Sequence, residues 1–172
     1  MPQDRVGLRS RKYRLSYFDK DLKIRWWKNV VQHPTDAETD GVVFFQDHPV
    51  AINSRWERQT GKFTFYIDVY DSAGNCIIAG KEIASFNLER NATMAKPRFQ
   101  LSASREKLGI LLEVIRDKDE LFCFCTVDEH YATGVVRSAV AGYSRKEMDA
   151  GNFAVSDNND LALVTELTDP SG

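Results

Sequence analysis

The segments KFTFYIDVYDSAGNCIIAG, residues 62–80, and GILLEVIRDKDELFCFCTV, residues 109–127, decide the fold class. Each has aromatic and β-branched residues on both sides of a short turn rich in Asp, Gly or Lys, which is typical of two antiparallel strands joined by a hairpin turn. The first segment alternates apolar and polar side chains and predicts a half-buried strand. Its predicted core face is formed by Phe63, Phe65, Ile67 and Val69.

Further strands are expected on both sides of these hairpins. Residues 12–18 and 23–27 are predicted to pair through the turn DKDL, and residues 161–167 to form a last strand. The run GVVFF, residues 41–45, predicts a buried strand, whereas Pro49 argues against a central strand directly after it.

Two segments carry helical spacing. Residues 104–108 are predicted to form one helical turn, and residues 128–141 a short helix whose apolar face is Tyr131, Val135, Val136 and Ala139. The predicted fold class is therefore mostly β, or α+β: an antiparallel barrel or sandwich with one or two short helices.

Length and composition favour a single domain. The chain has 172 residues and a net charge of −2. We expect one β-rich domain over residues 1–155, followed by an acidic C-terminal strand or tail over 156–172. No run approaches the roughly 20 apolar residues of a transmembrane helix, and the N-terminus lacks the apolar core of a signal peptide. Three cysteines, an odd number, fit a reducing compartment. We expect an intracellular protein, in the cytoplasm or a host-cell cytoplasm.

The charge is unevenly distributed. Residues 1–30 hold nine Lys and Arg against three Asp and Glu, whereas residues 151–172 hold four acidic residues and no Lys or Arg. Solvated termini are the simple explanation of this asymmetry. The alternative is a basic contact surface at the start of the chain, facing phosphate or another acidic partner.

The sequence predicts no catalytic residues, no metal site and no cofactor. His33, His48 and His130 are isolated, and no zinc-ligand spacing is present. Cys123 and Cys125 are expected to be buried on one face of a strand. Asp68, Asp71 and Glu82 suggest a metal-dependent nuclease only as a third hypothesis, because the order Lys81-Glu82 does not match the Glu-x-Lys of a common nuclease core.

The basic, aromatic N-terminal segment is the predicted binding surface. Cationic side chains neutralise phosphates, and exposed rings stack on bases. Arg11, Arg14, Lys23 and Arg25 are predicted to hold phosphates, with Tyr17 or Trp27 stacking. Because Trp26 and Trp27 are adjacent in a strand, one ring is expected in the core and the other outside it. The full predicted set is Arg9, Arg11, Lys12, Arg14, Tyr17, Lys23, Arg25, Trp27 and Lys28.

The string PRFQLSASREKLGILLEVIRDKDELFCFCTVDEHYATGVVRSAVAG, over about residues 97–143, resembles the N-terminal DNA-recognition domain of EcoRII-type restriction enzymes. The shared pattern is an apolar strand beginning at Gly109, an acidic turn, a strand ending in Asp128-Glu129 and a short helix. The resemblance implies a β pseudobarrel that binds DNA. The chain lacks that family's Gly-His-Gln loop, so no contact residue is carried over.

The strings IDVYDSAG, residues 67–74, and REKLGILLEVIRDKDELFCFCTVD, residues 105–128, also look like the C-terminal part of rhabdovirus matrix proteins. This resemblance implies self-association and contact with nucleoprotein and membrane. A basic start and an acidic end would suit head-to-tail assembly.

The sequence therefore predicts a non-enzymatic binding module that contacts nucleic acid or nucleoprotein through residues 9–28. The alternative is a self-associating structural protein, such as a viral matrix-like protein, and thus a homo-oligomer.

Overall fold

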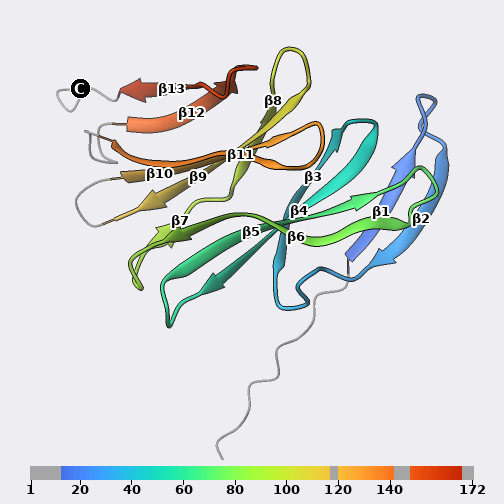
Figure 1. The fold of residues 1–172 in the computed structure, drawn as a ribbon, viewed down its shortest axis with the longest axis horizontal. Coiled ribbons are helices and arrows are strands. Elements are labelled where there is room, and N and C mark those ends of the chain that lie inside the picture. The colour runs from blue at the N-terminus through green and yellow to red at the C-terminus, as the bar shows by residue number, and fades with distance from the viewer. Residues whose placement is uncertain (1–12, 117–119, 142–147, 168–172) are drawn as a thin grey trace, which may run out of the picture.

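The computed structural model describes residues 13–116, 120–141 and 148–167, and every regular element in them is a β-strand (Figure 1). One antiparallel sheet consists of β3 (Glu38–Phe45), β4 (His48–Glu57), β5 (Lys62–Tyr70) and β6 (Cys76–Asn87). A second sheet consists of β7 (Thr93–Met94), β8 (Arg98–Leu101), β9 (Lys107–Ile115), β10 (Glu120–Asp128) and β11 (Thr133–Ala141). Two further hairpins are β1 (Tyr13–Phe18) with β2 (Ile24–Val30) and β12 (Met148–Val155) with β13 (Leu161–Leu167).

The two larger sheets form a sandwich. Residues of β4, β5, β9 and β10 share the main hydrophobic core, and none of the sheets in the described ranges closes on itself. The core face predicted for β5 is confirmed, since Phe65, Ile67 and Val69 have no exposed surface. Both hairpins that decide the fold class are present, as β5–β6 and β9–β10.

The strands β9 and β10 are buried on both faces. Leu108, Ile110, Cys123 and Cys125 face the main core, whereas Leu111, Phe122 and Phe124 pack with Phe153 and Val155 of β12 in a second core. A Cβ atom at Gly109 would lie 3.1 Å from the Val155 side chain, so the absence of a side chain there permits the close approach of β12. The C-terminal hairpin thus forms a third layer, and β12 pairs with β13 across the expected boundary at residue 155.

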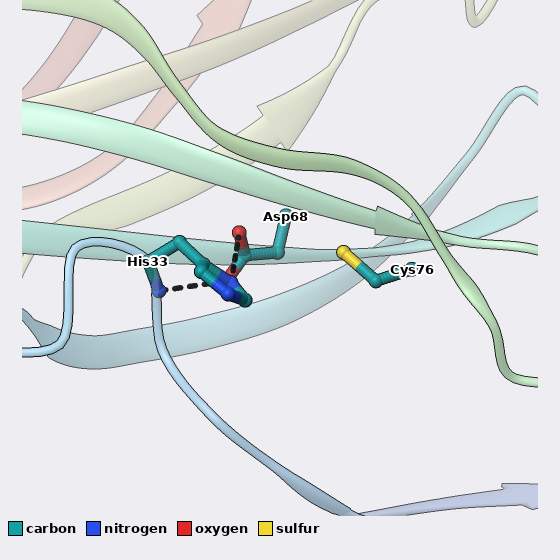
Figure 2. A group of neighbouring side chains, drawn as sticks. All are labelled: His33, Asp68 and Cys76. Atoms are coloured by element: carbon teal, nitrogen blue, oxygen red, sulfur yellow. Dashed lines mark hydrogen bonds and ion pairs between the residues drawn. The ribbon is translucent and has the colours of Figure 1, made fainter.

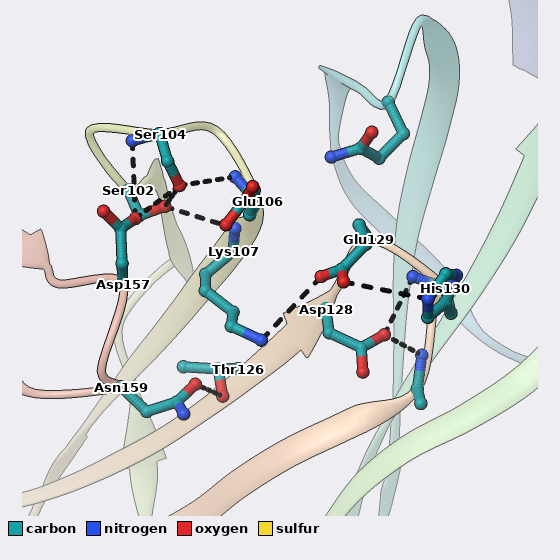
Figure 3. Close-up of polar contacts among 12 residues, drawn as sticks. Ser102, Ser104, Glu106, Lys107, Thr126, Asp128, Glu129, His130, Asp157 and Asn159 are labelled. Atoms are coloured by element: carbon teal, nitrogen blue, oxygen red, sulfur yellow. Dashed lines mark hydrogen bonds and ion pairs between the residues drawn. The ribbon is translucent and has the colours of Figure 1, made fainter.

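A polar network fastens the turn of this C-terminal hairpin to the second sheet (Figure 3). The Ser104 hydroxyl donates to the Asp157 carboxylate at 2.6 Å, and the Thr126 hydroxyl donates to the Asn159 amide oxygen at 2.8 Å. Thr126 is fully buried and also accepts a hydrogen bond from the Val135 backbone N–H at 2.9 Å. The acidic side chain of Asp157 therefore helps to hold the C-terminal hairpin against the second sheet.

The predicted helices are wrong for the described residues. Residues 128–132 form a turn closed by the Asp128 carboxylate, which accepts backbone N–H groups of His130 and Ala132, and β11 follows. The β11 backbone pairs with β10 from Glu120 to Val127, and this pairing overrides the helical spacing of its apolar residues. Residues 104–106 lie in the turn between β8 and β9 rather than in a helical turn.

Two expectations about the first sheet also need correction. GVVFF lies in β3, an edge strand whose Val42 and Phe44 are half exposed, rather than in a buried strand. Pro49 lies at the second position of a central strand, opposite Phe44. A proline is accommodated there because the strand has only just begun.

The outer face of β5 is buried more deeply than alternation predicts. Thr64 and Asp68 are 2% and 0% exposed. The segment between β2 and β3 lies over this face, since the backbone N–H of His33 contacts the Asp68 carboxylate at 3.3 Å.

The hairpin β1–β2 is docked on the turn between β5 and β6. The Trp26 indole N–H donates to the Ser72 carbonyl at 2.6 Å, its ring packs against Gly74, and Lys28 donates to the Asn75 side chain at 2.9 Å. Tyr17 stacks on Trp26 within the hairpin and on Phe44 of β3. Figure 1 shows the hairpins β1–β2 and β12–β13 at opposite ends of the molecule.

This docking predicts unequal losses of stability for the two adjacent tryptophans. Trp26→Ala removes a packed ring and a hydrogen bond and should lower the free energy of unfolding by about 2 kcal/mol. Trp27→Ala is the matched control, because its ring is 52% exposed, and should cost less than about 1 kcal/mol. Urea unfolding measures both. Equal losses would contradict the docking.

Candidate functional site

The hairpin β1–β2 has an inner and an outer face. In its register Leu15 lies opposite Lys28 and Tyr17 opposite Trp26, and this face is turned to the first sheet. Ser16 lies opposite Trp27 and Arg14 opposite Asn29 on the other face. Trp27 is exposed as expected, but Trp26 is only partly buried, against the turn between β5 and β6, and is not among the residues of either hydrophobic core.

The outer face combines a cation with an exposed ring. The Arg14 guanidinium carbon lies 4.5 Å from the centroid of the Trp27 ring, a cation–π contact between two exposed side chains. This geometry holds the guanidinium against the indole while the rest of the ring stays accessible. The pair therefore offers a positive charge and a stacking surface side by side.

Other predicted contact residues are distributed differently. Arg25 is 64% exposed, but its Nε lies 3.0 Å from the Asp19 carboxylate, which offsets part of its charge. Lys23 is exposed in the turn before β2. Tyr17 and Lys28 belong to the inner face, where both have partners in the body of the protein. Arg9, Arg11 and Lys12 lie outside the described residues.

A second group of side chains gathers where this hairpin joins the body. Asp68 is fully buried on β5, and its carboxylate accepts hydrogen bonds from the Asn53 amide at 2.8 Å and the Gly80 backbone N–H at 2.7 Å. His33 follows β2 and Cys76 begins β6, and both lie beside Asp68 (Figure 2). Cys76 is exposed, and its thiol donates to the Ile78 carbonyl at 3.1 Å.

Sequence reasoning missed this cluster for a physical reason. The positions of His33, Asp68 and Cys76 match no sequence motif of metal ligands, because His33 is far from the other two along the chain. The one signal in the sequence was Asp68 itself, a carboxylate within an otherwise apolar and aromatic strand. Cys123 and Cys125, in contrast, are buried in the core as expected.

Asp71, which the nuclease hypothesis paired with Asp68, is a turn residue. One carboxylate oxygen accepts the backbone N–H groups of Asn75 at 2.7 Å and Ala73 at 2.9 Å, and the other accepts from the Asn75 side chain. The hydrogen bonds from Asn75 hold the pKa of Asp71 below its ordinary value. These contacts close the turn on which the hairpin β1–β2 is docked.

A cavity of about 570 Å³ lies between β3 and the connector that precedes β8. Its apolar wall includes Trp56, Phe63 and Met94, and Asp40 and Lys96 are among its polar residues. One carboxylate oxygen of Asp40 is buried and accepts no hydrogen bond from any described residue. Burial raises the pKa of Asp40 to about 6, opposed by a hydrogen bond from Ser54.

No protein family, no curated protein and no solved structure matches this chain. The geometry of the described residues is therefore the basis for a functional proposal. No helix long and apolar enough to span a membrane occurs among those residues.

The raised pKa of Asp40 predicts a pH-dependent stability. The folded state holds a proton on Asp40 up to about pH 6, whereas the ordinary value is 3.8, so this contribution is complete below pH 3.8 and is lost as the pH rises through 6. Asp40→Asn should therefore raise the free energy of unfolding at pH 7 by about 1 kcal/mol. This is below the roughly 3 kcal/mol of a two-unit shift, because the side chain keeps some contact with water.

Urea unfolding of the wild type and the variant between pH 5 and pH 7 measures this difference. Asp36→Asn is the matched control, because Asp36 lines the same cavity but is exposed and ion-paired with Arg55 at 3.1 Å. A gap between wild type and Asp40→Asn that stays constant over this pH range would contradict the prediction.

Proposed function

We propose that this chain is a non-enzymatic binding module that contacts nucleic acid, free or within a nucleoprotein, through the outer face of the hairpin β1–β2. The observation that carries the proposal is the Arg14 guanidinium 4.5 Å from the centroid of the exposed Trp27 ring. A cation pairs with phosphate, and an exposed ring stacks on a base regardless of its identity. Trp27 is the stacking residue, because Tyr17 is already stacked between Trp26 and Phe44.

The charge of the hairpin supports this proposal. Residues 13–30 contain the basic residues Arg14, Lys20, Lys23, Arg25 and Lys28 against Asp19 and Asp21, although the whole chain has a net charge of −2. The hairpin therefore carries a local excess of positive charge, five basic against two acidic residues. Such a surface would contact the phosphate backbone with its cations and stack its ring on bases. Neither contact reads base edges, so we expect binding that does not depend on the nucleotide sequence.

The proposal predicts strongly salt-dependent binding. Three to four phosphate contacts imply a fall in affinity between roughly 50 and 200 mM salt of about 40- to 150-fold on duplex DNA and about 20- to 50-fold on single strands. Fluorescence anisotropy with labelled single- and double-stranded DNA and RNA of about 20 nucleotides, longer than a common single-strand site, measures this. Changing Arg11, Arg14, Lys23 and Arg25 together to Gln should abolish binding, and Trp27→Ala should weaken single-strand binding by about 1–3 kcal/mol.

The matched control changes Arg58, Lys62, Lys81 and Arg90 to Gln. It removes the same charge from the first sheet and its loops. If both quadruple variants lose binding equally, the contact is a general charge effect and not a hairpin site. Absence of binding to all four nucleic acids at low salt would reject the proposal.

A second candidate, self-association, is favoured by β11. This strand ends the order β11-β10-β9-β7 and presents Val136 at 42% and Val140 at 56% exposure. An edge strand with exposed apolar side chains is a template for pairing with another strand. Under this candidate, light scattering should show oligomers that grow with protein concentration and decline in Val136→Lys, since a charge on the edge opposes pairing. A strict monomer at all concentrations would exclude it.

A further inference from the structure

Three potential metal ligands of different chemistry converge at the base of the hairpin β1–β2. A ring nitrogen of His33, a carboxylate oxygen of Asp68 and the sulfur of Cys76 all lie within 4.8 Å of one another (Figure 2). The three residues come from the segment after β2, from β5 and from the first position of β6. Figure 2 shows the Cys76 sulfur pointing toward the other two side chains.

The contact between His33 and Asp68 has the spacing of two metal ligands. The imidazole Nδ1 of His33 lies 3.3 Å from Asp68 Oδ1. This nitrogen is buried, and it makes no hydrogen bond of acceptable geometry with any described residue. Two ligands at about 2.0–2.1 Å from a tetrahedral zinc ion are about 3.3 Å apart. The two atoms are therefore separated as they would be if both bound one ion.

The donor set fits zinc. Imidazole, carboxylate and thiolate are the three side-chain ligands of Zn²⁺, and a thiolate disfavours Mg²⁺ and Ca²⁺, which prefer oxygen. Binding of a metal ion by Cys76 would replace the hydrogen bond that its thiol donates to the Ile78 carbonyl. His33 is 42% exposed and Cys76 is exposed, so an ion reaches the cluster from solvent.

The surroundings of Asp68 fix its orientation. The buried Asn53 amide donates to Asp68 Oδ2 at 2.8 Å, and the Asn53 carbonyl oxygen in turn accepts from Thr39 at 2.8 Å. The Gly80 N–H donates to Oδ1 at 2.7 Å. Such outer contacts orient a ligating carboxylate and tune its affinity for metal. At Gly80, where φ is +58°, a Cβ would approach His33 to 2.8 Å, so glycine lets the histidine segment pack here.

We infer that His33, Asp68 and Cys76 bind one Zn²⁺ ion, with a fourth position open to water or to a donor from a partner. The ion joins the segment after β2 to both β5 and β6. It therefore reinforces the attachment of the hairpin to the body beside the contacts of Trp26 and Lys28. Zinc binding requires no nucleic acid, so it stands or falls separately from the proposed function.

Titration of the metal-free protein with Co²⁺ and Zn²⁺ tests this inference. Cobalt should produce sulfur-to-metal charge-transfer absorption at one equivalent, and this signal reports on Cys76 because Cys123 and Cys125 are buried in the core. By calorimetry, Cys76→Ser and His33→Gln should each weaken Zn²⁺ binding by about 100-fold or more, since loss of an outer contact alone costs about 10- to 100-fold. Zn²⁺ should raise the thermal midpoint of the wild type but not that of Cys76→Ser or His33→Gln.

His130→Gln is the matched control, because its side chain is 82% exposed and lies outside the cluster. It should bind Zn²⁺ as the wild type does. Circular dichroism verifies that each variant is folded, and Asp68 is left unchanged because its carboxylate supports the fold. A cobalt complex without thiolate absorption, or equal zinc affinity in wild type, Cys76→Ser and His33→Gln, would overturn the inference.

Discussion

The buried carboxylate of Asp68 is the constraint on which the arrangement of the N-terminal half depends. A carboxyl group without contact to water is tolerated only when hydrogen bonds or opposite charges surround it. Asp68 meets this requirement with the Asn53 amide, the Gly80 N–H and the backbone of His33. These donors come from β4, from Gly80 in β6 and from the segment after β2, so satisfying one side chain fixes three segments relative to β5.

The position of the proposed binding surface follows from this constraint. The segment held at His33 leads directly back to β2, and Trp26 and Lys28 of that strand contact the turn whose shape Asp71 maintains. The inner face of the hairpin is thereby committed to the body, and the outer face, with Arg14 and Trp27, is left exposed. The proposed zinc ion would act at the same junction, so His33 and Asp68 would serve both hairpin placement and metal binding.

Burial of β9 and β10 on both faces organises the other half of the molecule. Alternate residues of each strand enter different cores, one shared with the first sheet and one shared with β12 and β13. The C-terminal hairpin is consequently a structural layer, and its turn is fastened by Asp157 and Asn159. Among the acidic residues of this region, Asp157 therefore has a role within the fold.

The sequence by itself determined the β class, the two central hairpins, the core face of β5, the burial of Cys123 and Cys125, and the separation of Trp26 from Trp27. These features depend on alternation and turn composition, which act over neighbouring residues. Only the tertiary structure decided that residues 133–141 form a strand, because pairing with β10 outweighed helical spacing, and that the outer face of β5 is covered. It also decided which basic residues share a face and which distant residues surround Asp68. Contacts between segments far apart in the chain leave no local pattern, so His33 and Cys76 could be brought to Asp68 only by the fold.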